Sequence, residues 1–79
     1  DPDKLGYYLQ KYKIKTVIDL LDAGVQDELN PARQEQIDAE QKAVDEFNKK
    51  HHANVVHVNI PSRQTPTSKN FFKVFLVGV

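Results

Sequence analysis

Two strand-like runs, separated by a segment long enough to hold a helix, constrain the fold of this chain more than any other feature. Residues 15–20 (KTVIDL) and 54–60 (NVVHVNI) are rich in β-branched side chains, which favour strands. The 33 residues between them allow the chain to return through a helix to the same end of a sheet. The sequence therefore predicts an α/β fold with a parallel crossover.

The segments that flank these runs have the patterns of helices. Residues 3–12 place leucines and tyrosines at helical spacing, which predicts a short amphipathic helix with its tyrosines packed in the core. Asn30-Pro31 is a typical helix start. Residues 31–50 follow it with an apolar face that also includes Glu40, so we expect a second helix there.

The C-terminal part of the chain allows two interpretations. Thr65-Pro66 repeats the start signal of a helix, and a helix over residues 66–75 would turn its phenylalanines inward. Phenylalanine and valine also suit strands, so residues 74–79 could instead pair as an edge strand. We favour the helix, which gives the order α-β-α-β-α and an incomplete three-layer α-β-α fold, a single partial domain over residues 1–79.

Composition narrows the class of protein. Eleven basic residues balance eleven acidic ones, so no bulk field attracts nucleic acid or an anionic membrane, and we expect neither as a partner. No apolar run approaches the roughly 20 residues of a membrane span, which predicts a soluble protein, with the cytoplasm as the expected compartment. Cysteine and methionine are absent, and we interpret the chain as a piece of a longer protein. The apolar residues 71–79 are expected to pack on a further segment or on a second copy of the chain.

The three histidines do not predict a metal site. His51 and His52 are adjacent, point in different directions and suit the C-terminal end of a helix. His57 lies on a predicted strand, on the same face as Val55, and we expect it to be a partly covered sheet residue. No acidic residue stands at a familiar ligand interval such as H-E-x-x-H. We therefore expect no metal and no other cofactor.

The loop after the second strand is the strongest candidate for a binding site. The polar residues of this loop are Ser62, Arg63, Gln64 and Thr65. Arg63 offers a planar fork that suits phosphate or carboxylate, and Thr65 begins a predicted helix whose N-terminus favours anions. A capped surface turn with a solvated arginine is an equal alternative.

Two aspartates at the end of the first strand are weaker candidates. Asp19 and Asp22 flank the carboxyl end of this strand, where parallel sheets gather catalytic carboxylates. However, Asp22 can simply begin a turn, and Asp19 is expected to alternate outward. We favour these structural roles for both residues.

The order of these motifs resembles the cysteine-dependent protein tyrosine phosphatase superfamily, and most of all its compact bacterial and phytase-like dual-specificity enzymes. LQKYKIKTVIDL, AEQKAVDEFNKK and VVHVNIPSRQTPTSKNF follow one another in the chain. In that family, a helix likewise leads into a strand, a surface helix follows, and a second strand ends in a proline-bearing loop. The resemblance implies hydrolysis of phosphate monoesters, with a phosphorylated substrate bound by the loop that holds Arg63, Gln64 and Thr65.

The resemblance also implies what the chain lacks. In the family, a later segment supplies a Cys-x5-Arg loop, whose thiolate attacks the phosphorus and whose amides and arginine hold the phosphate oxygens. This chain has no cysteine, so we expect it to be inactive alone. Ser62 falls at or near the position of the family's acid, usually an aspartate, and a serine cannot serve as that acid near neutral pH. Asp22 is the candidate substitute, and Leu21 stands where the family's first loop often carries arginine.

Two non-catalytic functions are alternatives. The loop could hold a phosphorylated or acidic partner through Arg63, or the chain could form an assembly through residues 71–79. Weak phosphate binding that salt screens would indicate the first alternative. Self-association in sedimentation would indicate the second.

Overall fold

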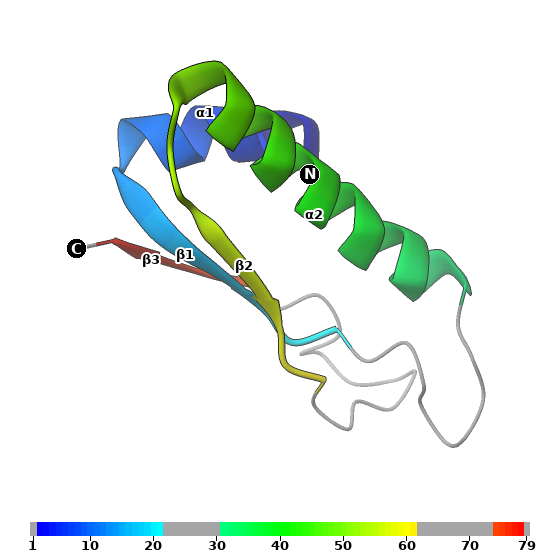
Figure 1. Cartoon of the computed structure of the whole chain (residues 1–79). Coiled ribbons are helices and arrows are strands. Elements are labelled where there is room, and N and C mark those ends of the chain that lie inside the picture. Colours follow the sequence, from blue (N-terminus) through cyan, green and yellow to red (C-terminus); the bar gives the residue numbers. More distant parts are fainter. Residues whose placement is uncertain (1, 22–30, 62–73, 79) are drawn as a thin grey trace.

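The computed structural model describes residues 2–21, 31–61 and 74–78 (Figure 1). Their elements follow the order α1 (Pro2–Lys11), β1 (Ile14–Asp19), α2 (Pro31–His51), β2 (Val56–Asn59) and β3 (Val74–Gly78). β1 is the middle strand of a three-stranded sheet, parallel to β2 and antiparallel to β3. The predicted α/β class and the parallel crossover from β1 through α2 to β2 are confirmed.

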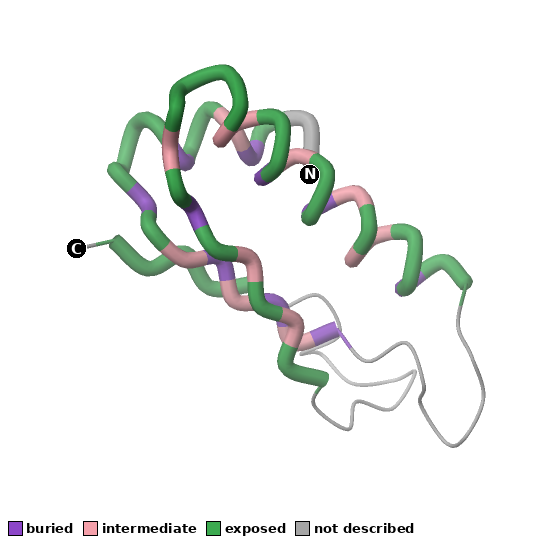
Figure 2. Tube along the Cα trace, viewed as in Figure 1, coloured by how far each residue is buried: buried purple, intermediate pink, exposed green. Residues whose placement is uncertain are grey.

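The core lies between the sheet and the two helices, which cover the same face of the sheet (Figure 1). α1 contacts α2 and β1, and α2 contacts β2. The buried apolar residues of this layer are Leu5, Leu9, Ile14, Val17, Val44 and Val55, and Figure 2 shows such buried positions on the helices, on β1 and just before β2. None of the described helices is long and apolar enough to span a membrane.

The tyrosines of α1 lie on the surface, so the prediction that they pack in the core is wrong. Tyr8 and Tyr12 are 39% and 56% exposed, whereas Leu5 and Leu9 are buried. Only a narrow face of α1 contacts α2 and β1, and Leu5 and Leu9 occupy that face. The rings of Tyr8 and Tyr12 instead stack on each other, with their centroids 6.2 Å apart.

Residues 74–78 form a strand that begins within the range of the predicted third helix. Val74 and Phe75, the last residues of the predicted helix, belong to β3, and residues 66–73 lie outside the described residues. β3 pairs with the edge of β1 that β2 leaves open. Hydrogen bonding to that open edge favours a β-branched and aromatic run as a strand over a helix. The edge-strand interpretation is therefore the one that the structure follows.

The face of the sheet that points away from the helices is apolar and exposed. The register places Ile18 between Val58 of β2 and Phe75 of β3, and these three side chains share the outer face because neighbours in register point the same way. Val58 and Phe75 are 37% and 48% exposed. Within residues 2–21, 31–61 and 74–78, no helix covers this face.

Asn48 fixes the turn that leads from α2 into β2. Its side-chain amide donates to the carbonyl oxygen of Val55 (2.9 Å), and its Oδ1 accepts from the backbone N–H of Val55 (2.8 Å). His52 follows the helix with a left-handed φ of 51°, and the N–H of Ala53 donates to the carbonyl oxygen of Asn48 (3.0 Å). These contacts hold the start of β2 at the last turn of α2.

We expect Asn48→Ala to lower the free energy of unfolding by about 1–3 kcal/mol, because the N–H and the carbonyl of buried Val55 both lose their partner. Urea unfolding of the two proteins measures the difference. Asn54→Ala, at an exposed position beside Val55, is the matched control and should change stability by less than about 0.5 kcal/mol. Equal losses in the two variants would contradict this role for Asn48.

Candidate functional site

Three side chains with metal-ligating or proton-transferring atoms meet between the sheet and α2. Asp19 ends β1, Glu40 lies in the middle of α2, and His57 is on β2. The register pairs Val17 with His57, so Asp19 and His57 both lie on the face of the sheet that the helices cover. One ligand atom from each of the three residues lies within 4.8 Å of the ligand atoms of the other two.

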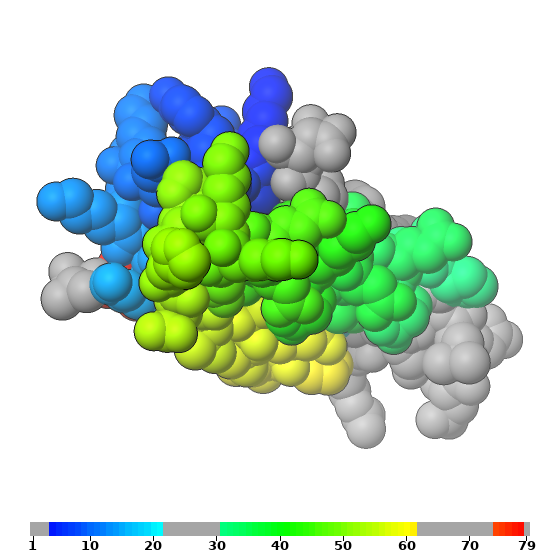
Figure 3. All heavy atoms as spheres, turned by 45° about the horizontal axis from the view of Figure 1, so that its top comes forward, coloured from blue at the N-terminus to red at the C-terminus, as the bar shows by residue number. Residues whose placement is uncertain are grey.

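This Asp19–Glu40–His57 cluster is buried. The side chain of Asp19 is 0% exposed, that of His57 3% and that of Glu40 6%, and in the space-filling view α2 lies directly against β2 (Figure 3). Nε2 of His57 is 3.4 Å from Glu40 Oε1 and 3.9 Å from Asp19 Oδ2. Asp19 was expected to alternate outward, and that prediction is wrong. Asp19 instead lies on the helix-facing side of β1, as does buried Val17, two residues before it in the chain.

In each carboxylate of the cluster, one oxygen accepts a hydrogen bond from a described residue and the other does not. Asp19 Oδ1 accepts the backbone N–H of Leu21 (2.7 Å), and Glu40 Oε2 accepts the side-chain amide of Gln36 (2.9 Å). Asp19 Oδ2 and Glu40 Oε1 have no hydrogen-bond partner in the described part of the chain. These two oxygens face the shared centre of the cluster.

The imidazole of His57 is oriented by a chain of hydrogen bonds along α2. The side-chain amide nitrogen of Gln41 donates to Asp45 Oδ1 (3.0 Å), and a carboxylate only accepts. This bond turns Oε1 of Gln41 toward His57, where it lies 3.0 Å from Nδ1. Nδ1 therefore carries the hydrogen, and Nε2 presents a lone pair to the two carboxylates.

Burial controls the charge of the cluster. Burial, followed by the neighbouring negative carboxylate of Asp19, raises the pKa of Glu40 to about 8, while the hydrogen bond from Gln36 opposes this rise. Burial also lowers the pKa of His57 below its ordinary value of 6.5, against the opposing charges of Asp19 and Asp45. Near neutral pH, a proton on Glu40 and a neutral His57 therefore reduce the charge inside the cluster.

The two parallel strands are tied together where they end. Asn59 donates from its side-chain amide to the carbonyl oxygens of Asp19 (3.2 Å) and Leu21 (2.9 Å). The N–H of Ile60 also donates to the carbonyl oxygen of Asp19 (2.7 Å). These hydrogen bonds hold the C-terminal ends of β1 and β2 side by side at one edge of the sheet. We call these two connected ends the tied strand exits.

The site residues predicted from the sequence follow these two strand exits. They are Asp22, Ser62, Arg63, Gln64 and Thr65, and all five lie outside the described residues. Leu21 and Pro61, the last described residues before them, are buried and exposed, respectively.

The buried cluster itself was not predicted. Glu40 was recognised as a polar residue on the apolar face of α2, and His57 was assigned to the same face of β2 as Val55. Combining these two signals with the position of Asp19, two residues after Val17, would have placed all three residues in one layer. A search for short ligand motifs misses them because each comes from a different element.

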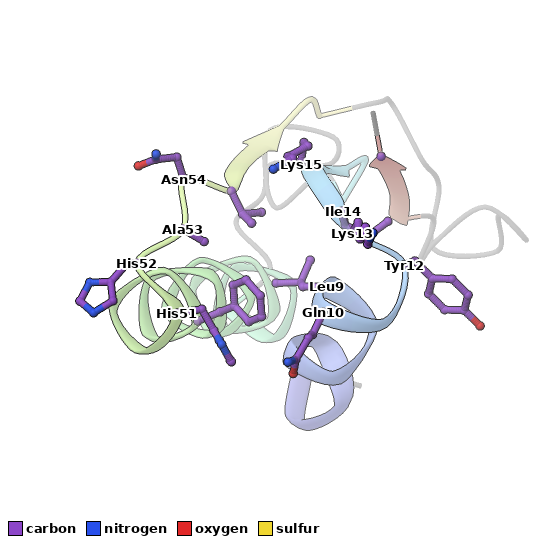
Figure 4. A pocket seen from close by; sticks show the side chains of 13 residues that line it. Leu9, Gln10, Tyr12, Lys13, Ile14, Lys15, His51, His52, Ala53 and Asn54 are labelled. Atoms are coloured by element: carbon purple, nitrogen blue, oxygen red, sulfur yellow. The ribbon is translucent and has the colours of Figure 1, made fainter.

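A groove of about 640 Å³ lies at the other end of the sheet (Figure 4). It is bounded by the ends of both helices and the starts of β1 and β2, with Leu9, Phe47 and Val55 in its wall. His52 and Tyr12 point away from its centre (Figure 4). None of the buried polar atoms that lack a hydrogen-bond partner in the described ranges belongs to it, so the cluster is the better candidate for a site.

Comparisons of the chain with protein-family models, curated proteins and solved structures give no significant match. A functional interpretation therefore depends on the chain's own residues. Two features are available for it, the buried cluster and the pair of tied strand exits.

Proposed function

We propose that the chain is part of a phosphatase-like domain that hydrolyses phosphate monoesters, in which the loop after β2 closes over the bound phosphate. The order of the sequence motifs supports this proposal. A strand, a crossover helix and a parallel strand follow one another in the same order in the structure.

The tied strand exits are the observation that carries the proposal. In open α/β sheets, ligands bind outside the carboxyl ends of parallel strands. The hydrogen bonds of Asn59 and Ile60 to the end of β1 bring the starts of both following loops to one place. Those loops contain Asp22, the candidate acid, and Arg63, whose guanidinium fork suits a phosphate.

The apolar outer face of the sheet supports a third layer. Its described members are Ile18, Val56, Val58, Ile60, Phe75 and Val77. An apolar face of this kind marks a contact surface, and we propose that a further segment of the same domain covers it. Because this chain has no cysteine, that further segment must also bring the nucleophile and its Cys-x5-Arg loop.

The proposal predicts that a longer protein containing this chain hydrolyses p-nitrophenyl phosphate, whereas residues 1–79 alone do not. In that longer protein, Arg63→Ala should lower kcat/KM by roughly 10–100-fold, because a charged group that binds the phosphate in the transition state is lost. Lys49→Ala, which removes an exposed charge near the end of α2, is the control and should leave kcat/KM unchanged.

Three outcomes would contradict this function. A coding sequence that contains no Cys-x5-Arg loop beyond this chain would exclude the cysteine mechanism. Phosphate binding by residues 1–79 that Arg63→Ala abolishes, without hydrolysis by the longer protein, would indicate a non-catalytic binding module. A stable dimer of residues 1–79 that persists in the longer protein would indicate that a second copy covers the outer face.

A further inference from the structure

We propose that Asp19, Glu40 and His57 form a binding site for a divalent transition-metal ion such as Zn²⁺. The site is separate from the phosphatase chemistry proposed above and does not depend on it. It would use one oxygen of each carboxylate and Nε2 of the imidazole.

The hydrogen bonds around Asp19, Glu40 and His57 hold the three side chains in orientations that suit metal binding. Metal-binding histidines and carboxylates usually have their remaining polar atoms held by outer partners, which fix the orientation of the ligand. Here Leu21, Gln36 and Gln41 hold the remaining atoms of the three residues. The three atoms left over, Oδ2, Oε1 and Nε2, are buried, converge, and have no hydrogen-bond partner among the described residues.

The spacing of these atoms fits an ion of the size of Zn²⁺. Oxygen and nitrogen ligands about 2.1 Å from a tetrahedral ion lie about 3.4 Å from one another. Nε2 of His57 is 3.4 Å from Glu40 Oε1 and 3.9 Å from Asp19 Oδ2. All three ligand atoms lie within 4.8 Å of one another, so binding of the ion would draw them together until each pair is about 3.4 Å apart.

The charges and donor types select the class of metal. A dication that displaces the proton of Glu40 meets two carboxylates and a neutral imidazole, whose charge of −2 it neutralises in a place where net charge is costly. An imidazole nitrogen favours Zn²⁺, Co²⁺ or another transition metal over Mg²⁺ and Ca²⁺, which prefer oxygen ligands. Three protein ligands also leave a coordination position for water or another small ligand, as in catalytic zinc sites.

The competing interpretation is a buried network in which a proton, and not a metal ion, joins the two carboxylates. Both interpretations explain the convergence of the three side chains. They differ in whether the addition of metal changes the protein. A titration of the chain with Zn²⁺ therefore decides between them.

The experiment uses residues 1–79, freed of metal by a chelator and then dialysed. Calorimetric titration with Zn²⁺ at pH 7 should give one ion per chain. At a free Zn²⁺ concentration about 100 times Kd, the Tm should rise by about 5 °C or more. Mg²⁺ at the same concentration should leave the Tm unchanged. Co²⁺ should produce the visible absorption bands of a low-coordinate site.

His57→Gln should weaken Zn²⁺ binding by about 100-fold or more, because it removes the only nitrogen ligand of the site. The double variant His51→Gln/His52→Gln is the matched control, because it removes two exposed imidazoles and should keep the wild-type affinity. Circular dichroism shows whether each variant is folded. If His57→Gln is unfolded, the long-range ¹H–¹⁵N NMR spectrum of the unmodified chain shows directly whether Nε2 of His57 shifts when Zn²⁺ is added.

Two results would overturn the proposal. Absence of Zn²⁺ binding by the unmodified chain would leave only the proton-sharing network. Binding that is lost with the His51/His52 double variant and kept with His57→Gln would place the ion on the surface histidines. Neither result bears on the phosphatase function, whose test requires the longer protein and its Cys-x5-Arg loop.

Discussion

Glu40→Gln is expected to stabilise the metal-free chain by about 1–4 kcal/mol at pH 8. The side chain of Glu40 is 6% exposed and must lose its proton beside Asp19 as the pH rises through its raised pKa. Glutamine keeps the shape of the protonated acid, can still accept from Gln36, and never acquires the charge. The gain should therefore be largest where Glu40 is ionised.

The same variant should change the pH dependence of stability. Burial and Asp19 raise the pKa of Glu40 from 4.5 to about 8, so the native state keeps a proton that the unfolded state has already released. The free energy of unfolding therefore falls as the pH rises toward 8, by at most about 1.4 kcal/mol per pH unit. The lowered pKa of His57 acts in the opposite direction, but only below its ordinary value of 6.5. The decline between pH 6.5 and 8 is thus the signature of Glu40.

Urea unfolding between pH 6.5 and 8, with a chelator present, measures this slope. Wild type should lose stability across the range, and Glu40→Gln should lose much less. Glu35→Gln, at an exposed position on the same helix, removes the same charge without the burial and should follow wild type. Parallel curves for wild type and Glu40→Gln would show that Glu40 is ionised throughout this range.

Leu9→Ala is expected to lower the free energy of unfolding by about 2–5 kcal/mol. Leu9 is 1% exposed and packs with Val17 and Val44 where α1, β1 and α2 meet, so the truncation leaves a cavity beneath both helices. Small domains have total stabilities near the lower end of about 5–15 kcal/mol. The variant should therefore be partly unfolded at 37 °C.

Leu76→Ala makes the same truncation on β3 at a side chain that is 36% exposed, so it is the matched control. We expect it to cost less than about 1 kcal/mol, because less apolar surface returns to water and little cavity forms. The midpoint of urea unfolding, at an unchanged m-value, measures both variants. Similar losses at the two positions would show that the core does not centre on the α1–β1–α2 junction.

Local patterns predicted the elements that depend on short-range contacts. The start of α2 at Pro31 follows from the geometry of proline in the first turn, and the two faces of β2 follow from the alternation of side chains along a strand. The same reasoning failed for the tyrosines of α1 and for Val74 and Phe75 of β3. The burial of the tyrosines depends on how much of α1 is covered by the other elements. The conformation of Val74 and Phe75 depends on the open edge of β1. Helical spacing in the sequence gives no information on either of these.

For the candidate site as well, the sequence predicted the faces of single elements but not the contacts between elements. Periodicity along single elements placed Glu40 on the inner face of α2 and His57 on the same face of β2 as Val55. The meeting of these residues with Asp19 was decided only by the tertiary structure, because it requires the parallel register of β1 with β2 and the crossing of α2 above both. Register and helix placement arise from contacts between residues far apart in the chain. For this reason, the sequence alone determined the strands and helices of the crossover, whereas the folded chain decided which of their polar side chains share a buried centre.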